Sequence, residues 1–174
     1  MLKRTDTNSV LIFTRTKYRA QKVASQIHRA GFKVTSLHGD RSQGQRQSAL
    51  KGFKAGTHDI MVATDIAARG LDVESISHVI NYDMPDTADA YIHRIGRTGR
   101  MERSGDAFTL VTPEDDAMVR TLEKIMGHGL RRETLPAFDY SAPPPVQSAS
   151  RTPSPARRPD RQPERSVNRN SYRR

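Results

Sequence analysis

The sequence contains no cysteine among its 174 residues. This absence excludes a disulfide framework and thiolate metal sites, and it is typical of proteins from a reducing compartment. Long apolar runs are missing too, because the longest strand-like one, Val10-Leu11-Ile12-Phe13, is far shorter than a membrane-spanning helix. The first residues lack the apolar stretch of a signal peptide. We therefore expect a soluble cytoplasmic protein that has no membrane partner.

Apolar residues become scarce from residue 141 onward, where seven of the ten prolines lie. Residues 141–174 carry eight Arg and two acidic residues, so much of the formal net charge of +10 comes from this short segment. We expect residues 9–140 to form one packed domain and residues 141–174 to be a disordered tail rich in Pro, Ser and Arg. The excess positive charge favours a polyanion such as nucleic acid, although basic tails also simply keep proteins soluble.

Short apolar runs alternate with helical patterns along the first 126 residues. Ser42 and Gln45 have the spacing of a capping box, Thr87 can cap a further helix, and Thr112-Pro113 can open the last one. Continuous apolar strands that alternate with helices predict an α/β fold, with a parallel sheet covered by helices on both faces. Ligands in such folds bind at the carboxyl ends of the strands. The predicted strands are Val10–Phe13, 32–37, Ile60–Ala63, 76–82 and 107–111.

The strongest motif is the run His93-Arg94-Ile95-Gly96-Arg97-Thr98-Gly99-Arg100, which we expect just after a short helix. Its three arginines recur at every third position and are separated by glycines. The guanidinium is a planar, permanently charged fork that matches phosphate oxygens, and glycine lets the backbone bend so that such forks reach outward. An ordinary basic helix end gives no reason for two glycines in four residues, so the run predicts a phosphate site.

A second motif, Ala63 to Asp72, begins at the end of a predicted buried strand. Thr64 offers a hydroxyl, Gly70 a permissive backbone, and Asp72 a carboxylate able to hold the hydroxyl pair of a ribose. The alternative is that Thr64 and Asp65 merely cap the next short helix. That alternative is stronger for Asp65 than for Asp72.

Two weaker segments also follow predicted strands. Thr14 and Arg15 come directly after the first strand, and Gly39 follows the second and precedes Gln43 and Arg46. Hydroxyls, glycine and basic groups at strand ends suit a phosphate backbone. The competing interpretation is structural, because the helix with the capping box needs some of these residues and Arg46 could be a solvated helix residue.

Taken together, the four segments resemble the motifs of the second RecA-like domain of superfamily 2 helicases, over roughly Ser9 to Gly127. His rather than Gln at position 93, and the segment Asn81-Tyr82-Asp83-Met84-Pro85, are similar to the DEAD-box RNA helicases. The resemblance implies that Arg97 is an arginine finger on the γ-phosphate of ATP, with Arg94 beside it. It also implies that His93 links to the first domain.

The same resemblance implies further ligand contacts. Gly70 and Asp72 would lie at the ATP, with Asp72 on its ribose. The residues that would hold RNA phosphates and sugars, without reading base sequence, are Thr64, Gln43, Arg46, Gly39, Thr14 and Arg15.

Two elements that ATP hydrolysis requires are missing. No glycine is followed by lysine, as a phosphate loop would need, and no Asp-Glu-Ala-Asp sequence occurs. We expect no metal ligands in this chain, and ATP and Mg²⁺ only when an N-terminal RecA-like domain completes the site, in cis or in trans. Residues 1–8 then resemble the remnant of an interdomain linker, and the isolated chain is predicted to be inactive. Alternatives are a stand-alone RNA-binding module with a RecA-like fold, or half of another superfamily 2 helicase that acts on DNA.

Overall fold

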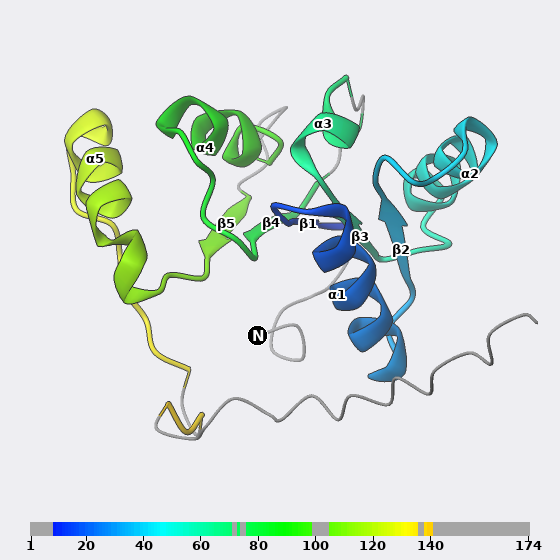
Figure 1. Ribbon diagram of the computed structural model, residues 1–174, viewed down its shortest axis with the longest axis horizontal. Coiled ribbons are helices and arrows are strands. Elements are labelled where there is room, and N and C mark those ends of the chain that lie inside the picture. The colour runs from blue at the N-terminus through cyan, green and yellow to red at the C-terminus, as the bar shows by residue number, and fades with distance from the viewer. Residues whose placement is uncertain (1–8, 71–72, 74–75, 99–104, 136–137, 141–174) are drawn as a thin grey trace, which may run out of the picture. The chain divides into compact units, whose positions relative to one another are not determined.

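The computed structural model describes residues 9–70, 73, 76–98, 105–135 and 138–140. Its described part contains a five-stranded sheet in the order β2-β3-β1-β4-β5 (Figure 1). All neighbouring strands pair in parallel. This confirms the predicted parallel α/β architecture. The strands are β1 (Val10–Phe13), β2 (Val34–Leu37), β3 (Ile60–Ala63), β4 (His78–Asn81) and β5 (Asp106–Thr109).

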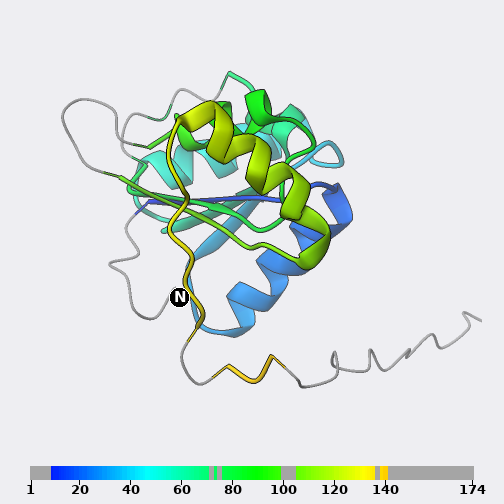
Figure 2. The same cartoon turned by 90° about the vertical axis from the view of Figure 1, so that its left-hand side faces the viewer.

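Helices connect the strands and cover both faces of the sheet, with α1 on one side and α3, α4 and α5 on the other (Figures 1 and 2). Parallel strands need such crossover connections, because a tight turn cannot bring the chain back to the same end of the sheet. The helices are α1 (Lys17–Arg29), α2 (Gln43–Lys54), α3 (Asp65–Ala68), α4 (Ala88–Ile95) and α5 (Asp116–Met126), with a short 3₁₀ helix η1 (Pro113–Asp115) before α5.

The central strand β1 explains why its sequence is an uninterrupted apolar run. Val10 and Ile12 point to the α1 side, where they pack with Val23. Leu11 and Phe13 point to the other side, which α2 and α3 cover. Successive side chains of a strand alternate between faces, so a strand buried on both faces must be apolar throughout. A third apolar cluster lies between α4 and α5.

The predicted helix starts are confirmed. Ser42 accepts a hydrogen bond from the Gln45 backbone at 3.3 Å, and the Gln45 side chain accepts one from the Ser42 backbone at 3.1 Å. Thr87 caps α4 by accepting from the Ala90 backbone. Thr112 opens η1 rather than α5 directly. The Ser42 and Thr87 caps use donors that a helix leaves unpaired in its first turn.

Three predicted strands are shorter than expected. Pairing fixes their bounds, since β2 begins only at Val34, β4 spans His78–Asn81, and β5 spans Asp106–Thr109 at the edge of the sheet. One expectation about the arginine run is wrong. His93 and Arg94 do not follow the helix but form the last turn of α4, because the helix continues to Ile95.

Contacts divide the chain into two units, Met1–Leu135 and Pro136–Arg174. The first contains the sheet. In the second, the rings of Phe138 and Tyr140 meet edge to face at 4.8 Å between centroids. No helix among the described residues is long and apolar enough to cross a membrane. The expected linker at 1–8 and tail at 141–174 lie outside the described residues.

Candidate functional site

The loops that follow β1, β2, β3 and β4 meet at the carboxyl edge of the sheet. The Thr14 backbone donates to the Ala63 carbonyl at 2.9 Å, and the Thr64 backbone donates to the Leu37 carbonyl at 3.3 Å. The Tyr82 backbone donates in turn to the Phe13 carbonyl at 2.9 Å. Side chains from four segments far apart in the sequence are therefore neighbours, as the strand order requires.

Arg94 is the most deeply buried charged residue at this edge, with 3% of its surface exposed. Its Nε and Nη2 donate to the two carboxylate oxygens of Asp65 at 2.7 and 2.6 Å. Its Nη1 donates to Asn81 Oδ1 at 3.2 Å and to the Asp83 carbonyl at 2.8 Å. The guanidinium also lies 5.1 Å from the centroid of the Phe13 ring. This one side chain joins α4 to α3 and to the end of β4, and its bidentate pairing is the geometry that arginine forms best.

The chain just after Arg94 is held at a second point. The Thr98 hydroxyl donates to the Ile76 carbonyl at 2.8 Å, and the Thr98 backbone donates to the Ile95 carbonyl at 3.1 Å. Half-buried Arg97 lies between these two fixed points, and its backbone donates to the Arg94 carbonyl at 3.1 Å. The backbone of Arg97 is thus positioned from both sides.

Glycine is favoured at position 96 by the space available for a side chain and not by the backbone conformation. Its φ of −66° is accessible to any residue, so the predicted backbone bend does not require glycine. A Cβ at this position would lie 3.1 Å from the Ile92 carbonyl oxygen, tighter than an ordinary contact. Gly70, in contrast, has a φ of +72°, in the left-handed region that favours glycine.

Asp83 forms a second junction, between β4 and the loop after β1. Its Oδ2 accepts from the Arg15 backbone at 2.8 Å, and its Oδ1 pairs with the Arg19 guanidinium. The Arg15 side chain donates to the Met84 carbonyl at 3.1 Å and approaches Asp86 at 3.4 Å. Because the Asp83 carbonyl also holds Arg94, one buried residue links the loop after β1 to the arginine run.

The loops after β1 and β2 are joined by an exposed ion pair. Lys17 Nζ lies 2.8 Å from Asp40 Oδ1, and this hydrogen bond, with the charge of Asp40, raises the pKa of Lys17. Nearby His38 is buried, and its Nε2 lies 3.2 Å from Gln21 Oε1. Burial, and secondarily the charge of Arg41, lowers the pKa of His38. The imidazole is therefore neutral at pH 7.

The predicted RNA-contacting residues differ in how far they reach solvent. Gly39 and Gln43 are exposed, and Arg46 is half-buried. Thr14 is fully buried, and its hydroxyl donates to the Thr16 carbonyl at 3.3 Å. Thr64 is buried at the N-terminus of α3 without a side-chain capping bond.

His93, the predicted link to the first domain, is exposed on α4, and Gly70, a predicted nucleotide contact, is exposed after α3. Asp72, Gly99 and Arg100 lie outside the described residues. The roles assigned to all these side chains stay predictions.

Three residues that organise the site were not predicted from the sequence to do so: Asp65, Asn81 and Asp83. Asp65 does not cap α3 but lies in its first turn and pairs with Arg94. Asn81 is fully buried at the end of β4, where its amide also donates to Thr109 Oγ1 at 3.1 Å. An amide side chain at the end of an otherwise apolar strand is the sequence signal that could have indicated such a network.

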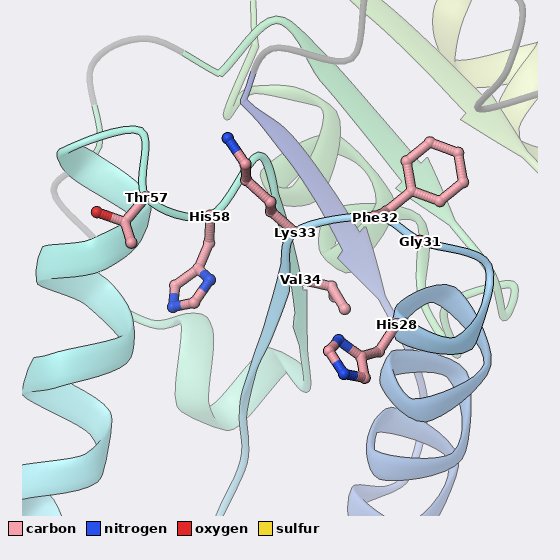
Figure 3. A pocket seen from close by; sticks show the side chains of 7 residues that line it. All are labelled: His28, Gly31, Phe32, Lys33, Val34, Thr57 and His58. Carbon is pink, nitrogen blue, oxygen red and sulfur yellow. The ribbon is translucent and has the colours of Figure 1, made fainter.

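A surface hollow lies at the opposite edge, where α1 ends and β2 begins (Figure 3). The rings of His28 and His58 flank Val34 there, with Lys33 above them. None of the candidate residues lines this hollow. It is therefore separate from the carboxyl-edge site.

A protein-family comparison identifies the helicase family of this fold. Residues 1–102 match the family described as helicase conserved C-terminal domain. The chain belongs to this helicase family. Its relatives are DEAD-box RNA helicases, and the expected RecA-like fold of their C-terminal domain is confirmed.

Curated relatives match about three quarters of this chain. It is 46% identical over 127 residues to the ATP-dependent rRNA helicase RRP3 of Candida glabrata, covering 73% of this chain and 26% of that protein. It is 40% identical over 129 residues to the DEAD-box ATP-dependent RNA helicase CshA of Bacillus subtilis, covering 74% of this chain and 26% of that protein. The chain therefore spans about a quarter of the length of these relatives.

Solved structures agree with this assignment. The DEAD-box protein SrmB of E. coli, bound to the regulator of ribonuclease activity A, gives a TM-score of 0.72 at 35% identity, covering 77% of this chain and 79% of that one. A DEAD-box protein of Methanococcus jannaschii gives a TM-score of 0.66 at 36% identity, covering 73% and 35%.

Proposed function

We propose that this chain supplies the C-terminal half of an ATP-dependent RNA helicase and is inactive without a first domain. Arg97 acts as the arginine finger on the ATP γ-phosphate. The observation that supports this role is the double anchoring of its backbone, by Arg94 on one side and by Thr98 on the other. A preorganised cation stabilises developing charge without reorganising during the reaction, which is the requirement for a finger.

Arg94 has a different role in this proposal. Within the described part of the chain, its guanidinium donates four hydrogen bonds, to Asp65, Asn81 and Asp83. Turning this guanidinium toward a nucleotide would leave the half-buried Asp65 carboxylate and the buried Asn81 amide oxygen without this partner, which is costly. The geometry therefore favours positioning of Arg97 by Arg94, and the expected contact of Arg94 with ATP stays a prediction.

In this proposal the chain contacts ATP, whereas the first domain binds Mg²⁺. The described residues bring together no group of three acidic or histidine side chains that could hold a metal ion. Mg²⁺ would thus be held by the first domain, where it would neutralise phosphate charge. This chain would contribute Arg97 to the phosphates, with Gly70 and Asp72 at the nucleotide and His93 facing the first domain.

RNA is the proposed polymer substrate, held by its backbone at the carboxyl edge. Exposed Gly39 and Gln43, with half-buried Arg46, lie at and after the end of β2. Arg15 contributes charge from the loop after β1, although its side chain already pairs with Asp86 and donates to the Met84 carbonyl. Buried Thr14 and Thr64 would act through their backbone or by shaping the loops. Such contacts bind without reading sequence.

The test is reconstitution of ATP hydrolysis. The chain is assayed alone with single-stranded RNA, and again fused downstream of a DEAD-box first domain that carries a phosphate loop and acidic box. We expect no turnover by the chain alone and RNA-stimulated turnover by the fusion. Turnover by the isolated chain that Arg97→Ala abolishes would contradict the proposal.

A further inference from the structure

Tyr18 is an aromatic side chain that the proposed backbone contacts do not use. It is the second residue of α1, and 75% of its surface is exposed. The buried face of α1 is formed by Ala20, Val23 and Ala24. Tyr18 therefore projects away from the core, at the start of the helix that follows β1 and its loop, where the candidate RNA edge begins. Single exposed apolar residues are common, so exposure alone indicates no ligand.

A cation over its ring makes this tyrosine different. Lys17 Nζ lies 5.1 Å from the centroid of the Tyr18 ring and 2.8 Å from Asp40 Oδ1. Two interactions thus hold the ammonium over the ring, one from the π face and one from a carboxylate on the next loop. With three-quarters of its surface exposed, Tyr18 remains accessible to a planar ligand.

The surroundings of the ring favour a nucleic acid over a protein partner. The neighbours of Tyr18 in the chain are Lys17 and Arg19, and exposed Lys22 lies one helical turn further on. A protein-binding aromatic anchor usually has an apolar surround that excludes water. Aromatic rings interleaved with cations are instead the pattern of single-stranded nucleic-acid binding, where bases stack and phosphates pair with the cations.

We propose that Tyr18 is a stacking platform for one base of single-stranded RNA, with Lys17 and Lys22 near the adjoining phosphates. The inference rests on the proposed RNA binding and extends it from backbone contact to base contact. Because every base has a π face, this contact adds affinity without strong sequence preference.

The experiment compares two fluorescein-labelled oligomers of equal length by anisotropy with the full chain. One is oligouridine, and the other has the same phosphate backbone without bases. We expect the wild type to bind oligouridine about tenfold more tightly than the abasic oligomer, the range of one stacked base. Tyr18→Ala should remove most of this preference while keeping abasic binding, and Tyr18→Phe should retain it.

Tyr140→Ala is the matched control, since Tyr140 is also exposed but lies in the second unit. It should keep the preference for bases, and circular dichroism confirms that each variant is folded. Equal binding of the two oligomers by the wild type overturns the stacking proposal and leaves RNA binding in place. Undiminished preference in Tyr18→Ala also overturns it. If neither oligomer binds, both the stacking and the RNA-binding proposals fail.

Discussion

The carboxyl edge of this domain holds two ion-pair regions that differ in burial. Around Arg94, the guanidinium is 3% exposed, its partner Asp65 is 39% exposed, and the contacts between them are 2.6 and 2.7 Å long. Around the start of α1, the side chains of Lys17 and Asp40 are 42% and 56% exposed. Buried pairs fix geometry because breaking them leaves an uncompensated charge, whereas exposed pairs are weak and exchange with water. The first region therefore sets positions, and the second can rearrange to admit a ligand.

The largest expected effect follows from removing the centre of the buried region. Arg94→Ala leaves the Asp65 carboxylate and the Asn81 amide without their partner. We expect the free energy of unfolding to fall by about 3–5 kcal/mol, measured by urea denaturation. Arg94→Lys should recover only part of it, because an ammonium cannot pair with a carboxylate through two parallel bonds. A loss below about 1 kcal/mol for Arg94→Ala would contradict the account.

Asp83→Asn tests the link from the arginine run to the loop after β1. The variant keeps the shape and the backbone carbonyl but removes the charge that pairs with Arg19. We expect a loss of about 1–3 kcal/mol in the same assay, because Asp83 is buried. Asp86→Asn is the control, since its carboxylate is 80% exposed and 3.4 Å from Arg15, and it should change stability by less than about 0.5 kcal/mol. Equal losses of stability in Asp83→Asn and Asp86→Asn would contradict the distinction between buried and exposed ion pairs.

Buried His38, near the Lys17–Asp40 pair, gives the stability of the domain a pH dependence. Its pKa is lowered in the folded state, mainly by burial, so the unfolded chain binds the proton more readily. The unfolding free energy should therefore fall as pH drops below the ordinary histidine pKa of about 6.5, by at most about 1.4 kcal/mol per pH unit. Denaturation of His38→Gln across pH 7 to 5 should show a shallower decline. An identical decline in the variant would show that other groups are responsible.

Lys17→Ala should have the smallest effect, because both partners of this ion pair are exposed. We expect only a small loss of stability, and one that shrinks at high salt. Thermal denaturation at low and high salt measures both. A large, salt-independent loss would mean that the exposed region is as rigid as the buried one.

The strands and helix starts could be predicted well from the sequence because the residues that determine them are neighbours in the chain. The apolar runs of β1 and β3, the Ser42 capping box and the Thr87 cap depend on neighbouring residues, and all are confirmed. The Arg94 network was not predicted, since Asp65 lies 29 residues from Arg94 in sequence and meets it only through the strand order.

The arginine run shows a second limit of sequence patterns. Its glycines and arginines identify the family, yet they do not distinguish the two arginines from each other. Periodicity treats Arg94 and Arg97 alike, whereas in the fold the first is buried and the second is half-buried. Only the position of α4 over the end of β4 separates their roles.

The central claim is that Arg94 positions and Arg97 acts, and one pair of measurements on the fusion protein tests it most directly. RNA-stimulated ATP turnover and urea stability are measured for Arg97→Ala, with the exposed residue Arg120 on α5 changed to Ala as the control. We predict that Arg97→Ala lowers turnover about a thousandfold and stability by no more than about 1 kcal/mol, and that the control changes neither. Turnover of Arg97→Ala within threefold of the parent would contradict the claim.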